Sequence, residues 1–182
     1  MRKFLATILF LGMCSTVTAV EVPYGFYSFC RVYIASTSCA VRTSGPPVPL
    51  TPELLVTLDD VNRLVRNTVR EETDLVLYQT VEHWTIPSTA GDCEDITLLK
   101  QILLVEKGVP AHAVLLGYVL DEQGGGHIVL LVHTNQGFLV LDNKNEKILP
   151  ICKTPYLLKS RQSVPNPLEW VSFPEGYCAA AH

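Results

Sequence analysis

The middle of the chain combines one helical run with three strand-like runs, and this order strongly restricts the fold. Residues 96–107 carry Ile, Leu and Val on most sides of a helix, and a glycine and a proline end the run. Three apolar segments follow at 113–120, 127–133 and 138–142, joined by glycine-containing turns. Short turns favour antiparallel pairing, so we predict an α+β fold in which a buried helix packs on an antiparallel sheet.

The remaining segments of the chain are less regular. A threonine and a proline at the start of residues 51–70, followed by apolar residues at helical spacing, predict an amphipathic helix there. Residues 20–50 are rich in Pro, Gly, Ser and Tyr, which indicates irregular surface structure. A short strand is expected at 147–151, and four prolines from residue 153 onward predict an extended tail.

Four polar residues of the 96–107 run fall along one narrow stripe, and this predicts a helix that is buried on most of its sides. The stripe consists of Thr97, Lys100, Gln101 and Lys107.

The beginning of the chain resembles an export signal in front of one globular domain. Arg2 and Lys3 precede an apolar run, and small residues follow up to Ala19. We therefore predict a signal peptide at 1–19, cleavage near Ala19 and a single domain at 20–182. No later segment has the roughly 20 consecutive apolar residues of a transmembrane helix, so we expect no stable membrane insertion.

The charge balance bears on the partners of the protein. The formal net charge is -4, and it becomes -6 when Arg2 and Lys3 leave with the signal. A protein this acidic lacks the basic surface that attracts phosphate backbones, so we expect no nucleic-acid partner.

The cysteine count suggests two disulfides and one free thiol. Six cysteines are present, and the one in the predicted signal leaves an odd number in the exported chain. In an oxidising compartment the simplest pairing joins Cys30 with Cys39 and Cys152 with Cys178, which leaves Cys93 unpaired. Ordinary buried thiols at Cys152 and Cys178 are the alternative to the second pair.

Cys93 stands at the predicted start of the helix, and His127 and Asp142 follow in the strand segments. A thiol, an imidazole and a carboxylate in that order suggest a nucleophile, its base and an orienting acid. The positive end of the helix dipole favours the thiolate. Alternatively, His127 is a surface histidine of a hairpin and Asp142 an ordinary turn residue. His133 and His112 rank below His127 as the base because of their positions in the strand and in the preceding loop.

Three carboxylates surround Cys93 in the sequence, and their charge disfavours ionisation of its thiol. Asp92 suits the N-cap of the helix, and Glu94 and Asp95 suit its first turn. Alternatively, some of these oxygens hold a hard cation, with Ca²⁺ the best match for an exported protein, and its charge would offset theirs. From the residues alone, helix capping is the simpler explanation.

Three segments together resemble the bacterial transglutaminase-like cysteine proteinases: Gly-Asp-Cys-Glu-Asp at 91–95, His-Ile-Val-Leu at 127–130 and Val-Leu-Asp-Asn at 140–143. Trp84, Pro87 and the first cysteine pair extend the similarity over most of the exported chain. The resemblance implies a papain-like or transglutaminase-like fold and a periplasmic location. The Trp84 indole is a candidate for the second oxyanion donor, beside the backbone N–H of the nucleophile.

The resemblance also implies roles for single residues. Cys93, His127 and Asp142 become the catalytic triad of a cysteine-type peptidase, and Asp92 and Glu94 become ligands of Ca²⁺. The implied partner is a protein substrate. A surface adhesin is a candidate for that substrate, and an inhibitory membrane receptor is a further candidate partner, because characterised relatives include a periplasmic protease that clips adhesins.

Two alternative functions use the same residues differently. If an amine replaces water, the same acyl-enzyme performs transglutamination, which makes the protein an acyltransferase. Alternatively, the protein is a disulfide-stabilised periplasmic binding module without activity, and its cysteine is a relic.

Overall fold

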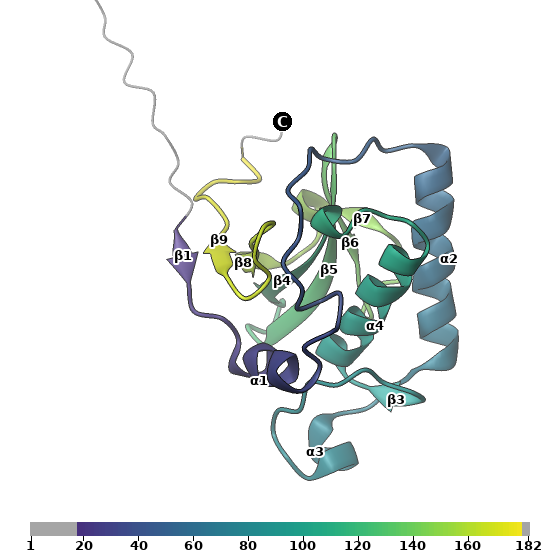
Figure 1. Cartoon of the computed structure of the whole chain (residues 1–182), viewed down its shortest axis with the longest axis vertical. Helices are drawn as coiled ribbons and strands as arrows, with labels where there is room; N and C mark the ends of the chain where they lie inside the picture. Colours follow the sequence, from purple (N-terminus) through teal and green to yellow (C-terminus); the bar gives the residue numbers. More distant parts are fainter. Residues whose placement is uncertain (1–17, 180–182) are drawn as a thin grey trace, which may run out of the picture.

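A seven-stranded antiparallel sheet forms the centre of the computed structural model, which describes residues 18–179 (Figure 1). The strands lie in the order β1-β9-β8-β4-β5-β6-β7. They span Ala19–Val20 (β1), Val114–Leu120 (β4), Gly126–Thr134 (β5), Gly137–Leu141 (β6), Leu149–Pro150 (β7), Leu157–Gln162 (β8) and Trp170–Ser172 (β9). The three strands predicted in the middle of the chain are confirmed as the β4-β5-β6 meander, and the strand expected at 147–151 is β7.

The described residues form four α-helices: α1 (Tyr24–Val32), α2 (Pro52–Thr68), α3 (Asp74–Tyr78) and α4 (Cys93–Glu106). Figure 1 shows α4 between the sheet and α2, so the α+β prediction with a buried helix on an antiparallel sheet is confirmed. As predicted, α2 starts at a proline, and Thr51 Oγ1 caps it by accepting the Leu54 N–H at 3.2 Å. A small parallel pair, β2 (Arg70–Glu71) and β3 (Ala90–Gly91), lies just before α4.

Both faces of the sheet are buried. Along β5, Ile128, Leu130 and Val132 belong to the core that includes side chains of α4, whereas Val129 and Leu131 belong to a second core on the other face. This alternation follows from the two-residue period of a strand. Burial on both faces explains why these strands appear as continuous apolar runs in the sequence.

The polar stripe of α4 faces the sheet. Three of its side chains donate hydrogen bonds to backbone carbonyls: Thr97 Oγ1 to Ile128 (3.3 Å), Lys100 Nζ to Asp142 (3.0 Å) and Gln101 Nε2 to Val114 (2.7 Å). Polar groups can be buried at low cost only when they are paired in this way. These bonds fix both the rotation and the axial position of α4 on the sheet.

The prediction of irregular structure for residues 20–50 is wrong for its first part, which contains α1. Phe26, Phe29 and Cys30 lie on the buried face of this helix, which packs into the main core. Glycine, serine and aromatic residues have modest helix propensity, so tertiary packing decides the outcome here. The predicted Cys30–Cys39 disulfide is confirmed.

The prediction of an extended tail from residue 153 onward is also wrong. The strands β8 and β9 belong to this segment, and β8 pairs with β4 inside the sheet. The prolines lie before β8, between the two strands and after β9, so residues 157–162 remain free to form a hydrogen-bonded ladder. The predicted Cys152–Cys178 disulfide is confirmed and ties the end of the described chain to the region before β8.

The predicted export signal falls almost entirely outside the described residues. Thr18 and Ala19 are the exceptions, and Ala19 pairs with Val171 in the sheet. The signal at 1–19 and the single domain at 20–182 stay predictions. Within residues 18–179, no helix has the length and apolar character needed to cross a membrane.

Gln162 connects four parts of the fold through a buried polar network. Its Oε1 accepts hydrogen bonds from the Leu116 N–H (3.0 Å), Gln101 Nε2 (3.1 Å) and Arg42 Nη2 (3.4 Å). Its Nε2 donates to the Ser38 carbonyl at 3.3 Å. Burial lowers the pKa of Arg42 to about 10, which leaves it charged at neutral pH.

We expect the Gln162→Leu substitution to lower the free energy of unfolding by about 3 kcal/mol, because it leaves the buried Leu116 N–H without its acceptor and removes one hydrogen bond each from Gln101 and Arg42. Urea denaturation measures this change. Gln136→Leu is the matched control, since Gln136 lies exposed in the β5–β6 turn. Equal denaturation midpoints for the two variants would contradict the role assigned to the network.

Candidate active site

Cys93 is the first residue of α4 and lies in a cavity of about 490 Å³. It is the only cysteine among residues 18–179 outside the two disulfides, as predicted. Gly91, just before it, packs so closely that an added Cβ would lie 2.7 Å from the Asp95 side chain. His127 and Trp84 line the same cavity.

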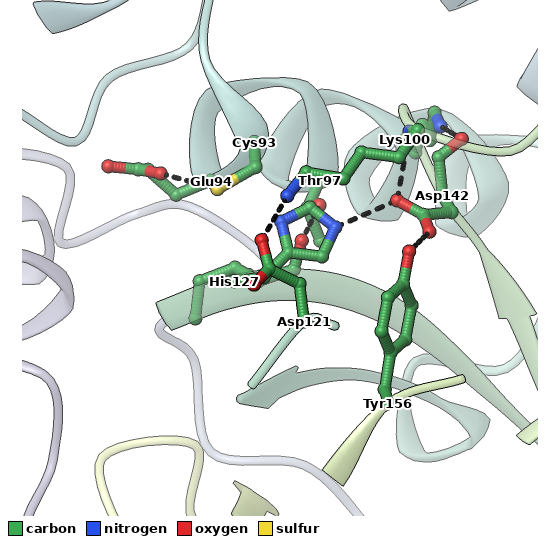
Figure 2. Close-up of polar contacts among 10 residues, drawn as sticks. Cys93, Glu94, Thr97, Lys100, Asp121, His127, Asp142 and Tyr156 are labelled. Atoms are coloured by element: carbon green, nitrogen blue, oxygen red, sulfur yellow. Dashed lines mark hydrogen bonds and ion pairs between the residues drawn. The ribbon is translucent and has the colours of Figure 1, made fainter. Parts of the chain in front are cut away.

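His127 lies in β5, Asp142 directly follows β6, and their side chains meet at the cavity that His127 lines. The imidazole Nε2 lies 2.9 Å from Asp142 Oδ1, and the two residues are only 2 % and 3 % exposed. In Figure 2 the ring lies between the Cys93 sulfur and the Asp142 carboxylate. A carboxylate accepts hydrogen bonds, so Nε2 carries the proton and Nδ1 is the acceptor of the neutral ring.

Asp142 is held from several directions. Its Oδ1 also accepts the Lys144 backbone N–H at 3.1 Å, its Oδ2 accepts the Tyr156 hydroxyl, and its carbonyl accepts Lys100 Nζ. Burial by itself would raise the pKa of Asp142, but the hydrogen bonds from His127 and Tyr156 outweigh it and hold that pKa below its ordinary value. The carboxylate is therefore ionised at neutral pH.

The Cys93 thiol lies in an environment that disfavours its ionisation. Its sulfur contacts Glu94 Oε2 at 3.0 Å. Burial, and after it the negative charge of Glu94, raises the pKa of Cys93 well above its ordinary value, although a hydrogen bond from the Ile128 backbone acts in the opposite direction. The expected stabilisation by the helix start is outweighed, and the thiol needs a base to remove its proton.

Three aspartates form a cluster beside Cys93. Asp74, Asp92 and Asp95 each contribute one carboxylate oxygen, and these oxygens lie within 4.8 Å of one another. Among the described residues, Asp74 Oδ1, Asp92 Oδ1 and Asp95 Oδ2 are buried without a hydrogen-bond partner. Asp92 occupies the N-cap position of α4, but its side chain makes no capping hydrogen bond there. Helix capping therefore does not explain Asp92, whereas a cation bound by the cluster would give these carboxylates a partner.

The charge in this cluster is costly without a cation. Burial, followed by the charge of Glu94, raises the pKa of Asp92 to about 8. Burial, followed by the charge of Asp92, raises the pKa of Asp95 to about 8, and burial also raises that of Asp74. Hard carboxylate oxygens of this kind are the ligands that Ca²⁺ prefers.

The second oxygens of the cluster bind the loop that leads to Trp84. Asp74 Oδ2 accepts the His83 backbone N–H, and Asp95 Oδ1 accepts the Thr85 backbone N–H at 2.7 Å. The cluster thereby joins α3 and residues 83–85 to the start of α4. Asp74 was not predicted from the sequence, because only this tertiary contact brings it to Asp92.

Trp84 is buried at the cavity, but its indole is already engaged. Its Nε1 donates to Glu82 Oε1. The indole N–H is therefore not free to serve as an oxyanion donor in this arrangement.

The two rival histidines lie elsewhere, and neither is among the residues that line the cavity. His133 stacks on Phe138, with 4.5 Å between the ring centroids. His112 Nε2 lies 3.1 Å from the Pro46 carbonyl oxygen. Only His127 shares the cavity with Cys93.

Comparison with known proteins identifies a family and related structures. The model of the family described as bacterial transglutaminase-like cysteine proteinase matches residues 16–177. Two structures of Legionella pneumophila LapG, one calcium-bound and one EGTA-treated, each share 25% identity with the chain at a TM-score of 0.54. The matched region covers 63% of this chain in both cases, and 67% and 66% of the LapG chains.

A third structure of Legionella pneumophila LapG supports the fold. It matches with a TM-score of 0.57 and 21% identity, over 74% of this chain and 81% of its own. The chain thus spans from about two thirds to four fifths of these LapG chains. Comparison with curated proteins gives no match.

We expect the metal-free protein to lose stability as the pH rises from about 4 to about 8. Asp92 and Asp95 have a raised pKa in the folded state, so folding favours their protonated forms. That contribution is complete below the ordinary pKa of 3.8 and is lost as the pH rises through about 8. Melting temperatures measured across this range in a chelator test the expectation.

Asp92→Asn should flatten this pH dependence, because an amide does not titrate. Asp59→Asn is the matched control, since Asp59 lies exposed on α2 and should leave the slope unchanged. A wild-type slope in the Asp92→Asn protein would contradict the assignment.

Proposed function

Since the chain belongs to the bacterial transglutaminase-like cysteine proteinases and is a cysteine peptidase, we propose that it hydrolyses a peptide bond of a periplasmic or surface protein with Cys93, His127 and Asp142 as its triad. The observation that supports this most directly is the His127–Asp142 hydrogen bond of 2.9 Å at the cavity that contains the free thiol. Base and acid are thus already oriented in the absence of substrate.

The geometry suggests how each side chain acts. His127 Nδ1 accepts the Cys93 proton while the sulfur attacks the substrate carbonyl carbon, and the same proton then passes to the leaving amine. Water hydrolyses the resulting acyl-enzyme with His127 as base. Asp142 keeps the proton on Nε2 and supports the imidazolium. The Cys93 backbone N–H, at the start of α4, is the first candidate for the oxyanion donor.

The substrate is a protein, and we place it outside the cytoplasm. The family makes the protein a peptidase, and the predicted signal at 1–19 would export the single domain at 20–182 to the periplasm. A surface adhesin remains the candidate substrate, and an inhibitory membrane receptor the candidate regulator.

We expect cells that carry the active protein to release new N-termini from at least one exported protein, and cells that carry Cys93→Ala to lack them. Mass spectrometry of N-terminal peptides from the exported fraction makes this measurement. His127→Ala should reduce cleavage at least 10³-fold, because nucleophile and base act as a unit. His133→Ala is the matched control, since His133 is outside the cavity. Unchanged cleavage by the Cys93→Ala protein would rule out the proposed mechanism.

Two measurements separate the alternatives. A labelled amine that becomes attached to substrate glutamine would identify the acceptor as an amine and the enzyme as a transglutaminase. A Cys93 thiol that reacts with iodoacetamide no faster than an unperturbed thiol, combined with no new N-termini, would favour a binding module.

We propose that Asp74, Asp92 and Asp95 hold Ca²⁺. The three buried oxygens without partners support this, and one LapG structure is calcium-bound. When bound, the cation would offset the negative charge that opposes thiolate formation at Cys93. The role of Glu94 as a ligand stays a prediction, because its Oε2 contacts the thiol.

We expect Ca²⁺ to raise the melting temperature relative to EGTA. At a Ca²⁺ concentration 100 times the dissociation constant, the free energy of unfolding should gain about 2.7 kcal/mol. The gain should grow from pH 5 to pH 8, because protonated carboxylates do not bind the cation. Asp74→Asn should reduce it, and Asp59→Asn should retain it. Superimposable melting curves in Ca²⁺ and in EGTA at pH 8 would refute the site.

A further inference from the structure

Tyr156 touches two members of the proposed triad at once. Its hydroxyl donates to Asp142 Oδ2, and the edge of its ring packs on the His127 imidazole with centroids 5.5 Å apart and planes at 68° (Figure 2). An edge-on contact of this kind holds a ring in one orientation. No sequence motif marks Tyr156, which follows Asp142 by 14 residues.

The phenol occupies the one Asp142 oxygen that the other contacts leave open. Oδ1 is bound by His127 Nε2 and by the Lys144 backbone N–H, whereas Oδ2 has Tyr156 as its partner. Without the phenol, a buried anionic oxygen would have no donor. The χ2 torsion of an aspartate has a broad distribution of angles with twofold symmetry. Without the phenol, the Asp142 carboxylate would be free to rotate away from His127.

We propose that Tyr156 is a positioning residue that locks the Asp142 carboxylate and the His127 ring into the orientation needed to accept the Cys93 proton. This inference rests on the proposed function of the triad.

Rigid elements carry Tyr156. It lies between the 3₁₀ turn Ile151–Lys153, which contains the disulfide-bonded Cys152, and strand β8. Thr154 Oγ1 donates to the Ile151 carbonyl at 2.6 Å and braces the turn. The next residue, Leu157, pairs with Leu120 of β4. Support from both sides suits a residue whose role is to hold another side chain in place.

The Tyr156 phenol stays protonated at neutral pH. Burial, and then its hydrogen bond to ionised Asp142, raises the pKa of Tyr156 above its ordinary value. It therefore acts as a hydrogen-bond donor and not as an acid or base in the reaction.

Tyr156→Phe tests the inference because it keeps the ring and removes only the hydroxyl. We expect the second-order rate constant for alkylation of Cys93 by iodoacetamide, measured in saturating Ca²⁺ at pH 7, to fall about ten-fold. In a plot of alkylation rate against pH, the low-pH limb should shift by about one unit to higher pH, because the ionised form of Asp142 loses a hydrogen bond. A change in packing alone would not move that limb.

Tyr177→Phe is the matched control. Tyr177 packs on Phe138 and Phe173 in the second core, away from the cavity. Alkylation of Cys93 in the Tyr177→Phe variant should therefore be as fast as in the wild type. Melting temperatures of both variants close to that of the wild type would show that each folds.

A double substitution shows whether Tyr156 acts through Asp142. Adding Tyr156→Phe to Asp142→Asn should slow alkylation no further than Asp142→Asn alone. An undiminished ten-fold loss in that background would overturn the inference.

The outcomes also separate this inference from the proposed function. If Tyr156→Phe matches the wild type at every pH while His127→Ala is slow, the role of Tyr156 is refuted and the triad stands. If His127→Ala also matches the wild type, the triad fails and the inference fails with it.

Discussion

Hydrogen bonds from the buried polar stripe of α4 to the sheet set the geometry of the whole site. Thr97, one helical turn after Cys93, donates to the carbonyl of Ile128, the residue next to His127. Lys100 donates to the carbonyl of Asp142 itself. A single helix therefore carries the free thiol and also bonds to the backbone beside His127 and at Asp142. Burial lowers the pKa of Lys100 to about 8, so the buried ammonium carries an electrostatic cost. Its hydrogen bond to Asp142 fixes the position of α4 on the sheet.

The two sides of the site are stabilised in opposite ways. On one side, His127 and Asp142 are hydrogen-bonded to each other, and neutral donors bind the remaining carboxylate positions. On the other side, several carboxylates lie close to Cys93, and some of their oxygens lack partners within the described residues. Electrostatic repulsion is therefore concentrated at the start of α4, where a cation would have its largest effect on both stability and reactivity.

Much of this site was predictable because its signals are local. The run after Cys93 has helical spacing, the predicted strand runs of His127 and Asp142 each follow a glycine-containing turn, and the odd cysteine count left one thiol free. Asp74 and Tyr156 gave no such signal, since their roles depend on how distant segments return to the site. The helix α1 and the strands β8 and β9 were missed for a related reason. Their residues have only a weak intrinsic preference for helix or strand, and tertiary packing and strand pairing stabilise them.

The polar stripe of α4 shows where pattern analysis stops. Periodicity identifies which side of a helix is polar, but it does not identify what that side faces. Here it faces carbonyls near the start of β5, just after β6 and at the start of β4, which accept its hydrogen bonds. The charged group of a lysine normally remains in water. Lys100 is buried here, and its ammonium donates a hydrogen bond to the Asp142 carbonyl. The most specific contacts of this fold are therefore made by residues that resemble a solvent-exposed face in the sequence.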